Sequence, residues 1–148
     1  MRPLHFLRRT RRGGNAMLEL ALAVPTLVLI LAGATDFGRL LNETMVLQGA
    51  SHRGALYASM NPDATDDAIT NVTTADLDGR TGVTVQVTRT CSCGNSTVAC
   101  NATSCASGGG APSTAIRVTA SKTLNTIIAY PGIPTPLGVA QATTMRSK

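Results

Sequence analysis

The sequence is poor in the side chains that active sites and nucleic-acid surfaces use most. Its 148 residues include two Tyr, two Phe, two His and no Trp, and only eight Asp and Glu residues in all. With so few aromatic rings, stacking platforms for nucleic-acid bases are not expected. The shortage of His and carboxylate side chains leaves little material for acid–base catalysis or for a metal site. The composition therefore favours a protein without catalytic activity, and we expect no cofactor and no metal.

The positive charge belongs to a short N-terminal segment. The formal net charge is +5, and residues 1–14 hold five of the 13 basic residues and no acidic one. From Asn15 onward, the remaining eight basic residues balance the eight acidic residues. A nucleic-acid-binding domain carries its positive charge on a folded face. Nucleic acid is therefore not an expected partner.

An apolar run, residues 16–35, follows the basic segment and contains one charged residue, Glu19. A helix of this length is about 30 Å long, which matches the hydrocarbon thickness of a bilayer. Arginines on its N-terminal side favour a cytoplasmic N-terminus and an extracytoplasmic C-terminal domain. Pro25 is tolerated in a membrane helix, where it favours a kink. The run therefore predicts a single-pass anchor in the lipid bilayer of the cytoplasmic (inner) membrane.

Two other interpretations of the apolar run are open. A basic segment, an apolar stretch and small residues also describe a secretory signal peptide, here with cleavage after Ala34. Two features favour a retained helix: a signal peptide gains nothing from Glu19, and residues 36–60 contain no helix breaker except glycine. A buried core helix is disfavoured because residues 61–148 are too few and too polar to surround it.

The helix is expected to continue into solvent through residues 36–60. Asp36 and Arg39 are spaced so that their side chains meet on a helix, as are Arg39 and Glu43. Glycines in this segment weaken a helix by about 1 kcal/mol each relative to alanine, although small residues suit places where another helix packs closely. The helix should end at Asn61, because the residue before a proline avoids the helical region.

Residues 61–148 predict a small α+β domain after the long helix. Residues 62–77 suit a short helix, with Asp side chains in its first turns. Alternating apolar and polar residues predict strands at 82–90 and 114–122, and a third is expected at 137–146. The expected architecture is an antiparallel sheet of about three strands whose apolar face the helices cover. Its core would contain Val83, Val85, Val87, Ile116 and Val118.

The four cysteines lie in one loop, residues 91–105, between the first two predicted strands: Cys91, Cys93, Cys100 and Cys105. Two disulfides would allow three connectivities. A zinc site is the other interpretation, but the loop contains no CxxC pair and no nearby His, which structural zinc sites normally use. An extracytoplasmic location favours disulfides, which would also stabilise a small domain with a thin core.

The start of the apolar run resembles that of type IV prepilins, in which a glycine precedes the helix and a glutamate is the fifth residue after it. Gly14, Asn15 and Glu19 have this spacing. Residues 11–60 resemble the TadE-like pseudopilins of the tight-adherence (Flp) pilus system. Those proteins share a Glu/Asp-Phe-Gly-Arg segment and a Gly-Ala-x-Tyr-Ala segment. The corresponding residues here are Asp36, Phe37, Gly38 and Arg39, followed by Gly54, Ala55, Leu56, Tyr57 and Ala58.

The resemblance implies a structural and assembly component of a bacterial type IV pilus. Its partners would be a prepilin peptidase, other pilins or pseudopilins and the pilus assembly machinery. The peptidase would cut after Gly14, dividing a basic leader (1–14) from a long helix (15–60) and an extracytoplasmic domain (61–148). The two short segments are then expected to serve helix packing, and the mature protein could join a cell-surface pilus that mediates adhesion.

The resemblance also implies a role for Glu19. Its carboxylate would pair with the N-terminal amine of a neighbouring subunit, since a buried charge is costly unless it is paired. Alternatively, Glu19 reaches water at the cytoplasmic interface. Two other functions are open for the whole chain: a membrane-anchored extracytoplasmic binding module that never enters a filament, and a secreted, disulfide-stapled protein.

Overall fold

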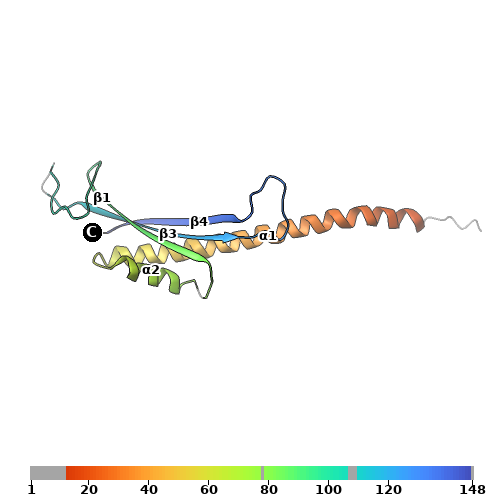
Figure 1. The fold of residues 1–148 in the computed structure, drawn as a ribbon, viewed down its shortest axis with the longest axis horizontal. Coiled ribbons are helices and arrows are strands. Elements are labelled where there is room, and N and C mark those ends of the chain that lie inside the picture. Colours follow the sequence, from red (N-terminus) through yellow and green to blue (C-terminus); the bar gives the residue numbers. More distant parts are fainter. Residues whose placement is uncertain (1–12, 78, 107–109, 148) are drawn as a thin grey trace, which may run out of the picture.

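The computed structural model describes residues 13–77, 79–106 and 110–147, and it shows an elongated molecule (Figure 1). One helix, α1 (Gly13–Met60), contains 48 residues. At 1.5 Å per residue it is about 72 Å long. A small α+β domain packs along its C-terminal half, while its N-terminal half extends beyond the domain (Figure 1). The predicted fold class, a long N-terminal helix followed by a small α+β domain, is confirmed.

The helix α1 runs without a break from the apolar run into the domain. Pro25 lies inside it, and the helix continues on both sides. At its end, the backbone N–H of Asn61 donates to the Tyr57 carbonyl (3.0 Å), and the Asn61 side chain donates to the same oxygen (2.9 Å). The end before Pro62 follows the expected restriction on the residue that precedes a proline.

The second helix, α2 (Asp66–Ala75), is shorter than the interval predicted from the sequence. It begins after Thr65, whose hydroxyl accepts a hydrogen bond from the backbone N–H of Ala68 (3.2 Å). Thr65 is therefore the N-cap, and it satisfies one of the amides that the first turn leaves free. Asp66 and Asp67 lie in that first turn, where negative charge is favourable.

The sheet has four antiparallel strands in the order β2-β1-β3-β4. These are β1 (Val83–Cys93), β2 (Ser96–Val98), β3 (Ser113–Leu124) and β4 (Leu137–Ser147). The long strands are the three that the sequence predicted. The short strand β2 was not predicted, and it pairs with the end of β1 through a hairpin at Gly94, which has a φ of 62°. Glycine adopts this left-handed conformation without steric cost.

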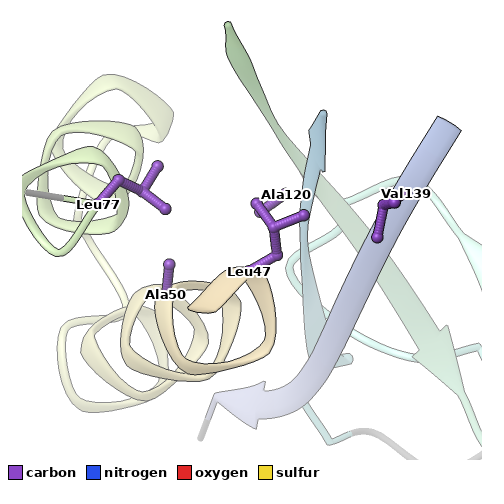
Figure 2. Close-up of a cluster of buried hydrophobic side chains, with 5 residues drawn as sticks. All are labelled: Leu47, Ala50, Leu77, Ala120 and Val139. Carbon is purple, nitrogen blue, oxygen red and sulfur yellow. The ribbon is translucent and has the colours of Figure 1, made fainter. Parts of the chain in front are cut away.

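The core lies between α1 and one face of the sheet, in two clusters of buried side chains. The first contains Leu47, Ala50, Leu77, Ala120 and Val139. Figure 2 shows Leu47 of α1 directed toward Ala120 of the sheet, and Ala50 on the side of α1 that faces Leu77. The second contains Ala55, Ala58, Ile69, Ile116 and Val118. Small residues on this face of α1 let the helix lie close to the sheet.

The predicted core is confirmed in the centre of the sheet and is less complete at its edge. Ile116 and Val118 of β3 are fully buried. Val83, Val85 and Val87 of β1 are only half-buried. The helix α1 packs on β3 and β4, so that β1 is covered by the short helix α2. One helix of 10 residues cannot shield a strand of 11 residues as fully as α1 shields its neighbours.

Candidate membrane anchor and assembly surface

The N-terminal part of α1 presents a continuous apolar surface to its surroundings. Every side chain from Ala16 to Leu31 is exposed. The most apolar 18-residue window has a mean hydropathy of 2.1, and none of that window is buried. Met17, Leu22 and Ile30 are 79%, 73% and 63% exposed. A surface of this size needs lipid or another protein to cover it, and its length is compatible with a single-pass membrane anchor.

Glu19 is the one charged side chain on this surface between Ala16 and Thr35. It is exposed and forms no ion pair with any residue that the structure describes. Gly14 and Asn15 belong to the first turn of α1. The Asn15 side chain and residues 1–12, which include most of the expected leader, lie outside the described residues. Cleavage after Gly14 therefore stays a prediction.

Asp36 ties the end of the apolar segment to the loop between β3 and β4. Both of its carboxylate oxygens lie 3.0 Å from the backbone nitrogen of Ile127, which donates to them. The hydroxyl of Tyr130 donates to the same carboxylate at 3.2 Å. Arg39 lies one turn further along α1, with its guanidinium 3.6 Å from Asp36. This ion pair is one of the two that the helical spacing suggested.

The hydroxyl of Tyr130 is held in its neutral form by this arrangement. Desolvation, the hydrogen bond to Asp36 and the negative charge of that carboxylate all raise the pKa of Tyr130 above its ordinary value of 10.0. An ionised phenol could not donate a hydrogen bond and would repel the carboxylate. The neutral hydroxyl can donate to Asp36, and the raised pKa extends this contact to a higher pH.

Phe37 and Gly38 belong to the first of the two motifs of α1, residues 36–39; the second is residues 54–58. Phe37 is 60% exposed. A Cβ atom placed on Gly38 would meet nothing within 4 Å among the described residues. Both residues are therefore available to lipid or to another protein, and their expected role in helix packing stays a prediction.

The second motif packs inside the chain. Gly54 is buried, and a Cβ atom at this position would lie 2.1 Å from the Thr73 hydroxyl oxygen of α2 and 3.3 Å from Val118 of β3. Ala55 is fully buried and Tyr57 is half-buried against the same core cluster. Gly54 is thus a point of close approach between α1 and α2, and only a glycine fits there without a shift.

The structure corrects the expected pairing of Glu43 with Arg39. The Glu43 carboxylate instead lies 2.8 Å from Arg80 and 3.1 Å from Lys122. Its side chain is 13% exposed, and its other carboxylate oxygen is buried without a hydrogen-bond partner in the described chain. On α1, Glu43 faces the sheet, so it meets cations from the segment before β1 and from β3. No sequence signal marked these partners, which are 37 and 79 residues away.

The four cysteines form two pairs at bonding distance, Cys91–Cys100 and Cys93–Cys105. Their Cα atoms are 5.1 Å and 5.6 Å apart, within the range of ordinary disulfides. Cys91 is buried at the end of β1, while the loop that it anchors is polar and largely exposed. This loop lies at the end of the domain opposite to the bare part of α1 (Figure 1). The described residues contain no cluster of three or more His, Cys, Asp or Glu side chains able to hold a metal ion.

Comparison with known proteins finds a family match for the N-terminal part of the chain. Residues 14–56 match a family model described as TadE-like protein. The long helix is TadE-like. The TadE-like match includes Gly14, Glu19 and the first motif, and it ends within the second motif. The match covers 43 of the 148 residues. No curated protein and no solved structure matches the chain.

Proposed function

We propose that the protein is a TadE-like minor pilin or pseudopilin, a structural component in the assembly of a tight-adherence pilus. It is inserted in the cytoplasmic membrane with its N-terminus inside and its domain outside, and a prepilin peptidase processes it after Gly14. The observation that carries this proposal is the TadE-like match over a helix whose N-terminal part packs against no other described residue of the chain. The role requires no catalytic step.

The exposed apolar surface of α1, from Ala16 to Leu31, suits a pilin both in the membrane and in an assembled filament. In the membrane, lipid covers the side chains from Ala16 to Leu31. Outside the membrane the same side chains need an apolar partner, because exposure of so large a patch to water is unfavourable. The α1 helices of neighbouring subunits can supply that partner. The exposed Phe37 and open Gly38 extend this surface toward the domain.

Glu19 gives the assembly its register in this proposal. Cleavage after Gly14 creates a positive amine at Asn15, which is one helical turn from Glu19. When subunits pack by their apolar surfaces, the Glu19 carboxylate of each subunit loses its hydrating water. The free-energy cost of burying this charge falls if the amine of an adjacent subunit lies beside it. Subunits displaced along the filament axis would leave the charges unpaired.

The processing step is tested by the mass of the N-terminal peptide of the protein from native cell envelopes. A chain that begins at Asn15 and keeps its apolar helix is the expected result. Gly14→Val should block cleavage, while Gly13→Val is the matched control and should be processed normally. A native chain that begins at Met1 would refute processing, and one that begins at Thr35 would indicate a secreted protein.

The assembly step is tested by Glu19→Ala. This variant should insert in the membrane normally but fail to support pilus assembly, measured by the pilin in the sheared cell-surface fraction. Thr26→Ala, which changes a neutral and exposed side chain on the same helix, is the control and should assemble normally. Normal piliation with Glu19→Ala would exclude the proposed pairing.

A second candidate function is a membrane-anchored binding module that stays outside the filament. Its support is the polar, disulfide-linked loop at the membrane-distal end of the domain, since residues 57–148 lie outside the TadE-like match. With this function, Glu19→Ala would have no effect on the protein's activity. The secreted alternative is disfavoured because cleavage after Ala34 would cut α1 beside Asp36, where the helix holds the β3–β4 loop.

A further inference from the structure

The loop between β3 and β4, residues 125–136, meets α1 at the level where the predicted membrane span ends. Asp36 accepts hydrogen bonds from Ile127 and Tyr130 of this loop. A Cβ atom on Gly33 would lie 3.8 Å from the Tyr130 hydroxyl. The span predicted from the sequence is 16–35. The loop is therefore beside the last turn of the span, at the height of a bilayer surface.

The loop has the side chains of a membrane-interface segment. No charged residue occurs from Thr123 to Met145. Ile127 and Ile133 are 58% and 46% exposed, and on the adjacent helix Phe37 is 60% exposed. Single exposed apolar residues are ordinary, but Phe37 and Ile133 border one groove of about 270 Å³ between the loop and α1. Tyrosine, which the loop also contains, is enriched at membrane–water interfaces.

The direction of the loop also suits a bilayer surface. In Figure 1 the loop projects sideways from α1, whereas β3 and β4 run along the helix. A segment that projects sideways from a spanning helix, at the end of the span, lies along the bilayer surface. Its apolar side chains then extend the bare surface of α1, so that one lipid phase covers both. This continuity favours lipid over a protein partner for the loop.

We propose that the β3–β4 loop is a second membrane contact, which lies in the headgroup region of the outer face of the cytoplasmic membrane. The inference rests on the anchoring of α1 proposed above. A single helix leaves the tilt and rotation of its domain free, and contacts near its end restrict them. With Asp36 as the fixed point, the loop holds the domain against the bilayer and directs the disulfide-linked loop away from it.

The absence of tryptophan from the chain makes a direct test possible. Ile133→Trp places one fluorophore at the exposed edge of the loop, Thr97→Trp places one in the distal strand β2, and Leu29→Trp places one in the bare part of α1. Each full-length variant is reconstituted in vesicles of phosphatidylethanolamine and phosphatidylglycerol, with and without lipids brominated near the headgroup end of the acyl chains. Thr97 and Leu29 are both exposed, so all three variants alter surface positions.

The proposal predicts that Trp fluorescence of the Ile133→Trp variant is quenched by brominated lipid and shielded from aqueous iodide. The Thr97→Trp variant should show the opposite behaviour. If Ile133→Trp responds as Thr97→Trp does while Leu29→Trp is quenched by lipid, the helix is inserted and the loop contact is wrong. Shielding from iodide without quenching by lipid would also overturn the proposal, because protein would then cover the loop. If brominated lipid does not quench the fluorescence of Leu29→Trp, the proposed anchoring of α1 in the membrane is itself wrong.

Discussion

The clearest structural prediction concerns Gly54, where the methyl group added by Gly54→Ala should disturb the packing of α1 against α2. In Gly54→Ala the new Cβ would lie 2.1 Å from the Thr73 hydroxyl oxygen, and 3.3 Å from both Thr73 Cβ and Val118 Cγ1. The hydroxyl cannot turn away without loss, because it donates to the Ile69 carbonyl (2.8 Å) and is fully buried. Either the Thr73 side chain rotates and loses this hydrogen bond, or α2 moves by more than 1 Å, roughly the shortfall from ordinary van der Waals contact.

The expected size of the effect is the difference of two terms. Overpacking of a tight core costs about 1–3 kcal/mol. Replacement of glycine by alanine in a helix returns about 1 kcal/mol. The change should therefore destabilise the domain by up to about 2 kcal/mol. Gly49→Ala is the matched control, since a Cβ there meets nothing within 4 Å, and it should stabilise the same helix.

Pulse proteolysis of the full chain in detergent, across a urea series, measures the folded fraction of each variant. A double-mutant cycle with Thr73→Ala, which removes the clashing hydroxyl, should show a favourable coupling of about 0.5–3 kcal/mol between the two sites. If Gly54→Ala is as stable as Gly49→Ala, or if the two changes are additive, the close approach of α1 to α2 at this point is wrong.

Three further predictions test other contacts. Glu43→Gln removes the charge that Arg80 and Lys122 share, and should cost about 1–3 kcal/mol in the same proteolysis assay, while Asp63→Asn, at an exposed acid, should cost nothing measurable. Partial reduction and alkylation, followed by mass spectrometry, should find Cys91 linked to Cys100 and Cys93 to Cys105, and a Cys91–Cys93 or Cys91–Cys105 bond would contradict the pairing. The raised pKa of Tyr130 stabilises the folded state below the ordinary value of 10.0, and this contribution should be lost as the pH rises through the folded-state pKa. Absorbance titration of the protein should therefore show a tyrosine transition above pH 10.0 that disappears in Tyr130→Phe.

The long helix and the three long strands were predictable because their signals are local. The alternation of Val83, Val85 and Val87 with polar residues marks β1 without reference to any other part of the chain. The apolar run marks the exposed half of α1 in the same way. The strand β2 has no such signal. Its three residues, two of them exposed, form a strand because the hairpin at Gly94 returns them to the end of β1.

The contacts of the site were less predictable, because they depend on which face of α1 meets the domain. The spacing of Arg39 and Glu43 is correct for an ion pair on a helix. In the structure Glu43 is directed into the domain, where it pairs with Arg80 and Lys122 instead of Arg39. The resemblance to TadE-like proteins marked Gly54 as a packing residue, but it could not name Thr73 as the neighbour. That neighbour follows from the crossing of two helices separated by a turn.

The two motifs of α1 have different partners, and their separation suggests how assembly and domain orientation are linked. Gly54 and Ala55 face the core, and Asp36 holds the β3–β4 loop about 27 Å further along the helix. Between these points Glu43 adds two ion pairs. The C-terminal half of α1 is therefore attached to the domain at several levels along the helix, and α1 and the domain should move as one body. Any contact that sets the rotation of the bare half of α1, whether with lipid or with a neighbouring subunit, would then also set the direction of the disulfide-linked loop at the far end.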